Sequence, residues 1–277
     1  MNRVLLCLCL SFVFLTGCSR LDIAFRWADT YIASKVDDYF DISSKQSKEL
    51  KNDINKDLQA IRTEVLPTWI ERLKGIQKEV NDGPLSEDRV SFYFALFLKD
   101  IEQINSKFSD TAVDFIATTN PEQITYFTKA FHKKNMEDLE KFQDKAKFKS
   151  EYRDKYIDWF EMFIGSLNKE QKNMLEESLN TSPFPADLKV KNKEFVFQKF
   201  LRETSSTEQM KAFVKNYYSN PESYDLPEYR EALAKYQKDM QKLVAQVLST
   251  LTPEQKSSLK ENLSEKIAQL HRIATRS

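Results

Sequence analysis

The stretch Leu251-Thr252-Pro253-Glu254-Gln255 has the form of a helix start, and close variants of it recur along the chain. A Ser, Thr or Asn side chain that caps a helix accepts a hydrogen bond from the backbone amide three residues later. Gln at that later position reaches back to the amide of the capping residue. Each variant therefore predicts the first turn of an α-helix. The other complete examples begin at Ser43, Asn120, Asn168 and Ser206, and a degenerate one begins at Ser86.

The composition also predicts helices. Only 4 Gly and 8 Pro occur in 277 residues, and apolar residues recur at steps of three and four between the helix starts. The connections between the periodic segments are mostly short, which favours antiparallel neighbours. We therefore expect an all-α fold, a multi-helix bundle of about ten helices. The spacing of the helix starts is irregular, so the sequence does not predict a strict solenoid repeat.

Two interruptions bear on the organisation of this bundle. Pro67 lies within a periodic segment that runs from about 44 to 80, and the periodicity continues beyond it, which predicts a kinked helix. The stretch Thr181-Ser182-Pro183-Phe184-Pro185 is the best candidate for a connection between lobes. We therefore place a candidate lobe boundary near 181–187, and the sequence leaves one lobe or two open.

The N-terminal stretch is typical of a lipoprotein signal. Arg3 precedes an apolar run from Val4 to Leu15, which is too short for a transmembrane helix of ~20 residues. The run ends in Leu15-Thr16-Gly17-Cys18, which offers small residues to a signal peptidase and a thiol for attachment of diacylglycerol. An ordinary secretory signal with a chance cysteine is the alternative.

Cleavage before Cys18 would remove residues 1–17 and leave an all-helical lipoprotein body at 18–277. Cys7 and Cys9 lie in the removed segment, so the only cysteine left would be acylated and no disulfide could form. Two acyl chains suffice for a stable bilayer anchor. By resemblance to the sorting rule of enteric bacteria, Ser19 favours the outer membrane, with the body facing the periplasm.

The charge balance and the side-chain inventory exclude several function classes. The 42 basic and 42 acidic residues are interspersed, and a periplasmic address argues further against nucleic acid as a partner. We expect no catalytic residues, no cofactor and no metal site. The 20 Phe and 11 Tyr are better explained by core packing between helices than by ligand stacking.

The residues that remain as site candidates each have a plainer explanation. His132 and His271 lack the Glu three residues earlier that a di-iron site requires, and exposed helix positions explain them. Asp37, Asp38 and Asp41 could bind a cation but lack the alternating spacing of a calcium loop, so a helix end is the better explanation. The stretch Lys189-Val190-Lys191-Asn192-Lys193 is explained by a solvated face, with contact to lipid headgroups as the alternative.

Two resemblances extend these predictions. The Leu-Thr-x-x-Gln helix start is similar to that of the small periplasmic stress chaperones of the Spy type, although helix capping alone generates the same pattern. Several stretches together resemble an uncharacterised family of proteobacterial lipoproteins, a domain of unknown function. They are Gly17 to Asp22, Val36 to Asp41 with Gln46, Glu64 to Pro67, Trp159 to Gln171 and Leu251 to Gln255. This resemblance implies an all-helical lipoprotein body and brings no known activity.

The leading hypothesis is a non-enzymatic lipoprotein, anchored in the outer membrane through Cys18, whose helical body binds or scaffolds other envelope proteins. The first alternative is a periplasmic chaperone that holds unfolded or lipidated clients in an aromatic-lined groove. A third class is an enzyme such as a carboxylate-based hydrolase, which would need two carboxylates that face each other in a deep cleft.

Overall fold

The computed structural model describes residues 20–275, and all the regular structure in this range is helical. The all-α, multi-helix prediction is therefore confirmed. The signal segment 1–17 and Cys18 lie outside the described residues. The α-helices are α2 (Arg20–Arg26), α3 (Ala28–Phe40), α4 (Ser44–Ala60), α5 (Leu66–Asp82), α6 (Glu87–Lys107), α7 (Ser109–Ala117), α8 (Pro121–Gln143), α9 (Lys145–Ile164), α10 (Lys169–Thr181), α11 (Ala186–Arg202), α12 (Thr207–Ser219), α13 (Pro227–Ser249) and α14 (Pro253–Ala274).

The kink expected at Pro67 is a π-helical turn, η1 (Ile61–Val65), between α4 and α5. Proline has no amide hydrogen, and its ring crowds the carbonyl four residues earlier, so a wider turn relieves the contact. The amide of Leu66 accordingly donates to the carbonyl of Ile61, five residues back. A short 3₁₀ turn, η2 (Pro221–Tyr224), precedes α13.

The predicted helix starts are confirmed. Ser43, Asn120, Asn168 and Thr252 form complete capping boxes, in which the cap side chain accepts from the Gln amide and the Gln side chain accepts from the cap amide. Ser206 and Ser86 make only the first of these two bonds.

The four Gln residues of the complete boxes also pair with one another, which the sequence does not reveal. In one pair, Gln46 Nε2 lies 3.1 Å from Gln123 Oε1, and Gln123 Nε2 lies 2.9 Å from Gln46 Oε1. Each side chain also donates to a carbonyl two residues before its partner's cap, Gln46 to Thr118 at 3.1 Å and Gln123 to Asp41 at 3.3 Å. We call this reciprocal pair a glutamine bridge.

A second glutamine bridge has the same form. The two amide groups of Gln171 and Gln255 exchange hydrogen bonds of 3.0 and 2.9 Å. Gln171 donates to the carbonyl of Thr250 at 3.4 Å, and Gln255 donates to the carbonyl of Ser166 at 2.8 Å. Each of these carbonyls again lies two residues before the partner's cap. The first bridge thus joins the starts of α4 and α8, and the second joins the starts of α10 and α14.

The matching bridges belong to a repeated arrangement in which α3–α8 corresponds to α9–α14. The packing of α3 on α4 and on α8 is matched by that of α9 on α10 and on α14. The packing of α4 on α7 is matched by that of α10 on α13. Asp41 (φ 48°) and Gly165 (φ 72°) end the equivalent helices α3 and α9.

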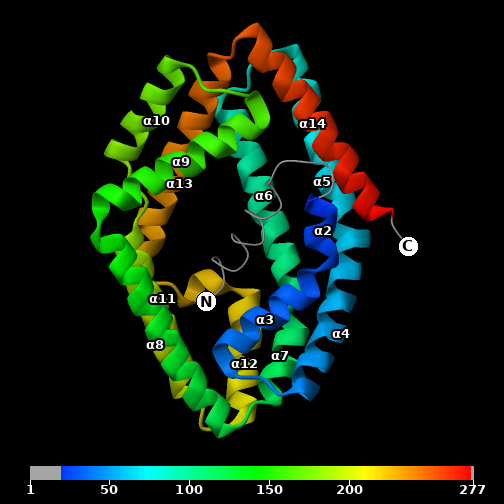
Figure 1. Ribbon diagram of the computed structural model, residues 1–277, viewed down its shortest axis with the longest axis vertical. Coiled ribbons are helices and arrows are strands. Elements are labelled where there is room, and N and C mark those ends of the chain that lie inside the picture. Colours follow the sequence, from blue (N-terminus) through cyan, green and yellow to red (C-terminus); the bar gives the residue numbers. More distant parts are fainter. Residues whose placement is uncertain (1–19, 276–277) are drawn as a thin grey trace.

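The middle helices of each unit cross into the other unit. Helix α5 packs on α14 and α6 packs on α13, just as α11 packs on α8 and α12 packs on α7. The result is an elongated ring of helices (Figure 1), with one bridged four-helix group at each end. The chain crosses at η1 in the first unit and at residues 182–185 in the second, where the sequence suggested a candidate lobe boundary.

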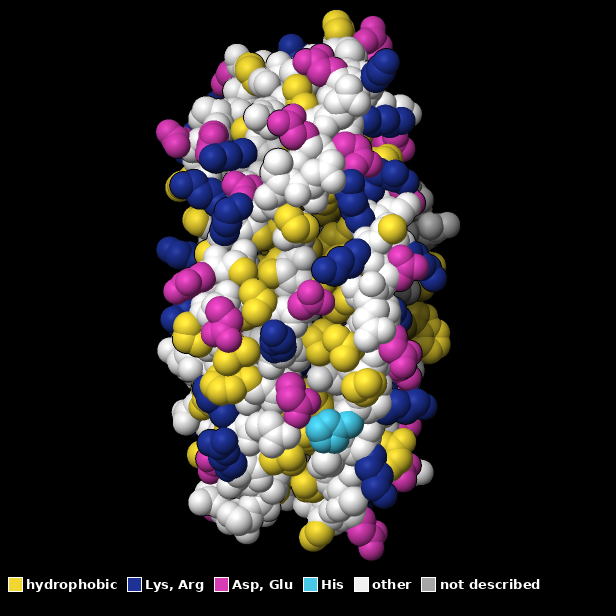
Figure 2. All heavy atoms as spheres, turned by 90° about the vertical axis from the view of Figure 1, so that its left-hand side faces the viewer, with side chains coloured by type: hydrophobic (Ala, Val, Ile, Leu, Met, Phe, Trp, Pro, Cys, Tyr) yellow, Lys and Arg dark blue, Asp and Glu magenta, His cyan; other side chains and the backbone are white. Residues whose placement is uncertain are grey.

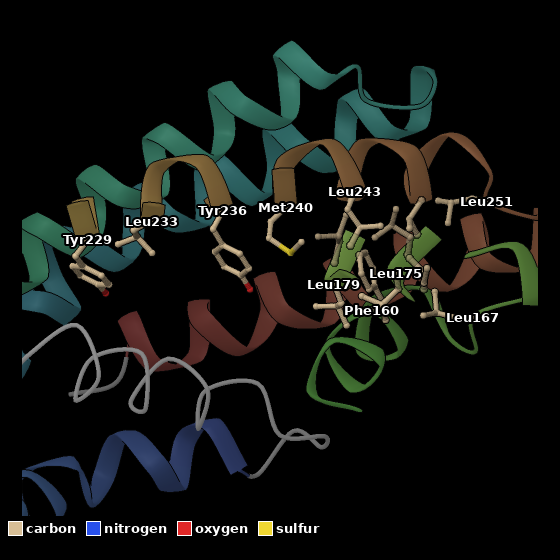
Figure 3. Close-up of a cluster of buried hydrophobic side chains, with 14 residues drawn as sticks. Phe160, Leu167, Leu175, Leu179, Tyr229, Leu233, Tyr236, Met240, Leu243 and Leu251 are labelled. Atoms are coloured by element: carbon tan, nitrogen blue, oxygen red, sulfur yellow. The ribbon is translucent and has the colours of Figure 1, made fainter. Parts of the chain in front are cut away.

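Each half of the ring has its own hydrophobic cluster. In the α9–α14 half, α13 supplies one side of a cluster from Tyr229 to Val247 (Figure 3). Phe160 and Leu175 complete it from α9 and α10. A cluster in the opposite half combines Phe side chains of α3, α8 and α11 with Ile116 of α7 and Met210 of α12.

We expect Gln171→Ala to lower the free energy of unfolding of the 19–277 body by about 3 kcal/mol, measured by urea denaturation. The substitution removes both hydrogen bonds of the bridge at a buried site, so Gln255 keeps only Ser166 and the amide of its own cap as partners. It also removes half of a capping box. The matched control is Gln209→Ala, which alters the same motif position where the side chain is exposed and forms no glutamine bridge. It should cost at most about 0.5 kcal/mol.

The double variant Gln171→Ala with Gln255→Ala should cost clearly less than the sum of the two single variants, because each single variant already breaks the shared bonds. Additive costs would show that the bridge contributes nothing beyond the two caps.

Candidate apolar binding site

A cavity of about 790 Å³ lies within the half of the ring that contains α3. Helices α2, α3, α4, α7, α8, α11 and α12 contribute to its walls, together with η1, the start of α5, the end of α6 and the last turns of α14. Its volume falls within the range of about 300–1,000 Å³ typical of sites for small ligands. Most of its lining side chains are aliphatic or aromatic, so its walls suit an apolar ligand.

Stacked aromatic rings form one wall of this cavity. Phe40 of α3 stacks on Phe127 of α8 with ring centroids 4.5 Å apart, and Phe131 stacks on Phe197 of α11 at 3.9 Å. The one-turn spacing of Phe127 and Phe131 places both on one face of α8. The expectation that aromatic residues serve the core is therefore correct for these rings, and the same rings also line the cavity.

Helix α2 forms an apolar rim. Ile23, Ala24 and Trp27, the residue that follows the helix, all line the cavity. Ile23 is nevertheless 49% exposed and Trp27 is 63% exposed. Large apolar side chains with this much solvent contact mark the accessible side of the site.

A polar spot lies in the cavity wall at Thr111 of α7 and Tyr218 of α12. Thr111 lies next to Asp57 of α4, whose Oδ2 has no hydrogen-bond partner among the described residues. Burial raises the pKa of the Asp57 carboxyl to about 6. Burial likewise raises the pKa of Tyr218 to about 12, and the Asp57 charge adds to this shift.

Lys193 also reaches the cavity, contrary to the expectation that residues 189–193 form a solvated face. Its side chain is 14% exposed, and its Nζ lies 2.8 Å from Asp138 Oδ2. Val190 and Asn192 are each 7% exposed, and Asn192 donates to Asp225 at 2.7 Å. This segment is therefore packed between α8 and the turn before α13, which only the tertiary contacts reveal.

The histidines and the acidic trio have the structural roles expected of them. His132 and His271 are exposed on different helices. Asp37 accepts from the amide of Ile42, and Asp38 lies 2.8 Å from Lys35. Asp41 ends α3 with φ 48°.

Within residues 20–275, no group of three His, Cys, Asp or Glu side chains is arranged to hold a metal ion.

A fully buried carboxylate, Asp100 of α6, lies 3.0 Å from Arg72 of α5 and is 2% exposed. Burial raises its pKa, and Arg72 partly offsets that effect. The half-buried Asp57 lies next to Thr111 instead, so the two carboxylates have different neighbours on different helices. Neither the arrangement of Asp100 nor that of Asp57 adds support to a hydrolase mechanism.

One outer face of the ring carries charges of both signs. Figure 2 shows the side of the ring that carries α8–α11, where basic and acidic side chains alternate around a strip of hydrophobic ones. A mixed surface of this kind produces no single-sign field on that side. In the described part of the chain, no helix combines the length and the apolar character needed to cross a membrane.

The fold and the cavity define an all-helical protein with an internal apolar site. The chain belongs to a family of unknown function, DUF6279, whose model matches residues 38–230, well over half of its length. No curated protein and no solved structure gives a significant match.

The cavity was not predicted, because its lining residues carry the same periodic signal as a filled core. The aromatic content does not mark it either, because α9 is rich in aromatic residues and supplies no lining residue.

We expect the stability of the protein to depend on Asp57 ionisation. The folded pKa of about 6 exceeds the unfolded value of about 3.9, so this group stabilises the fold fully below about pH 4, and that stabilisation is lost as the pH rises through 6. Because Asp57 is only half-buried, we expect a loss of about 1 kcal/mol. Urea denaturation between pH 4 and 7.5 should show this decline relative to Asp57→Asn. Parallel curves for the two proteins would contradict the assignment.

Proposed function

We propose that this protein is an envelope lipoprotein, anchored in the outer membrane through Cys18, whose periplasmic body binds a long acyl chain in the apolar cavity. The observation that carries the proposal is the cavity itself, about 790 Å³ of space with almost entirely apolar walls. Burial of a methylene group contributes about 0.8 kcal/mol, so a long hydrocarbon chain gains more from such walls than a compact polar metabolite does.

The anchor is supported by the sequence Leu15-Thr16-Gly17-Cys18 and by the start of α2 only two residues after Cys18. So short a connection would hold the body near the bilayer, where acyl chains are abundant. Nucleic acid is not among the proposed partners, since the surface charge is mixed.

A second candidate function is a chaperone with a narrower range of clients. The Leu-Thr-x-x-Gln starts, which resemble those of Spy-type chaperones, are here used for the glutamine bridges. An internal cavity of this size suits a lipid chain of a client better than an unfolded polypeptide. We therefore favour lipidated envelope proteins over unfolded ones among the clients.

Cys18→Ala should abolish incorporation of labelled palmitate and leave an uncleaved precursor that retains residues 1–17. The thiol is the atom to be alkylated, so no other residue can replace it. Metabolic labelling and the mobility of the protein on a gel measure both effects. Palmitate labelling that survives in Cys18→Ala would contradict the lipoprotein assignment.

Ala112→Trp should weaken the binding of a fluorescent fatty acid to the 19–277 body at least about tenfold, which corresponds to 1.4 kcal/mol. Ala112 lines the cavity from α7, so an indole there occupies ligand space. Ala117→Trp is the matched control, because Ala117 is exposed near the end of the same helix and is not part of the lining. Equal affinities for the two variants would place the fatty acid elsewhere.

A further inference from the structure

Helix α2 stands outside the repeat of the fold. The first unit begins at α3 and the second at α9, and α8 leads into α9 with only Asp144 between them. The second unit therefore has no equivalent of α2. This additional helix packs on α3 and on the C-terminal helix α14, both of which supply walls of the cavity.

The cavity belongs to the half of the ring that α2 enters. Ile23 and Ala24 reach it from α2 and Trp27 from the residue that follows. In the other half, Phe184 lies edge-on to Tyr236, and the Tyr236 hydroxyl bonds to that of Tyr156 within a packed cluster. The cavity and the additional helix α2 thus lie in the same half of the ring.

The connection from Cys18 to this site is very short. Arg20, the first residue of α2, is two residues after Cys18, so the two Cα atoms are at most ~7 Å apart along an extended chain. Ile23, three residues after Arg20, lines the cavity. A lipid on Cys18 therefore starts beside the accessible rim of the cavity.

The length of the cavity suits a lipid chain. Leu50, Ile54 and Ile61 line it along α4 and into η1, which is about 16 Å at 1.5 Å per residue. An acyl chain in a bilayer spans one leaflet, about half of a 30 Å hydrocarbon core, or ~15 Å. One extended chain therefore matches the apolar wall.

We propose that the ligand of this cavity is an acyl chain of the protein's own lipidated Cys18. The inference rests on the proposed lipoprotein function. The acyl chain alternates between two apolar environments, the bilayer and the cavity. The protein body can therefore shield part of its own lipid anchor from water when the protein leaves a membrane.

Covalent attachment favours the protein's own lipid over other apolar ligands. A short connection raises the effective concentration of a tethered group to the millimolar range or above, whereas a free fatty acid or another lipoprotein competes at its bulk concentration. The bilayer is the main competitor. Burial of a methylene group contributes ~0.8 kcal/mol in either environment, so the bilayer-bound and cavity-bound states can be close in free energy.

The test uses the full-length protein in cells fed a palmitate analogue that carries a photoreactive diazirine. After irradiation, mass spectrometry should find the acyl chain of Cys18 crosslinked to peptides from α3 and α7 of the same chain. Ala112→Trp and, from the α12 wall, Val214→Trp should each reduce these crosslinks about tenfold, whereas Ala117→Trp should leave them unchanged. Circular dichroism of each variant verifies its helical fold.

The possible results separate this inference from the function on which it rests. Label on Cys18 whose crosslinks lie only in phospholipid would overturn the docking and leave the lipoprotein assignment intact. Crosslinks that join two differently tagged copies would overturn docking within one chain. Absence of label from Cys18 would overturn both the lipoprotein assignment and the docking.

Discussion

The glutamine bridge is the interaction on which the architecture depends. A Gln side chain offers two acceptor sites on Oε1 and two donors on Nε2. Gln171 uses all four, since Oε1 accepts from the amide of Asn168 and from Gln255, while Nε2 donates to Gln255 and to the carbonyl of Thr250. Glutamate lacks the donors and arginine lacks the acceptor, so neither can replace it. The buried amide groups are therefore satisfied only when the two helix starts meet.

The same chemistry explains why the other two helix starts have a different role. Ser206 and Ser86 begin the crossing helices α12 and α6, where no partner start is available. Gln209 remains exposed there. Arg89 replaces Gln after Ser86, and it binds Glu79 and the hydroxyl of Tyr93 within its own helical hairpin. The bridged starts fix the two ends of the ring, and the unbridged starts belong to the helices that join one end to the other.

The sequence predicts the local structure well because the signals for it are local. Capping residues and apolar periodicity lie within a few positions of the helices that they specify, and Pro67 marks its own kink. The breaks after Arg26 and Lys107 carry no such local signal, because neither Trp27 nor Phe108 is a residue that disrupts helices. The bridges join positions 77 and 84 residues apart. No local pattern distinguishes Gln123, which has such a partner, from Gln209, which has none.

The cavity follows from an imperfect repeat. Two units that exchange their middle helices would form equal cores if their side chains were equivalent. The α9–α14 unit fills its core with Phe160, Leu175 and the α13 side chains. The α3–α8 unit is instead preceded by α2, and its aromatic rings stack with one another and with Phe197 of α11 around the remaining space. Close packing normally removes such a space, because unfilled volume costs dispersion energy. A ligand in this space would supply the missing contacts, and the apolar walls would suit an apolar one.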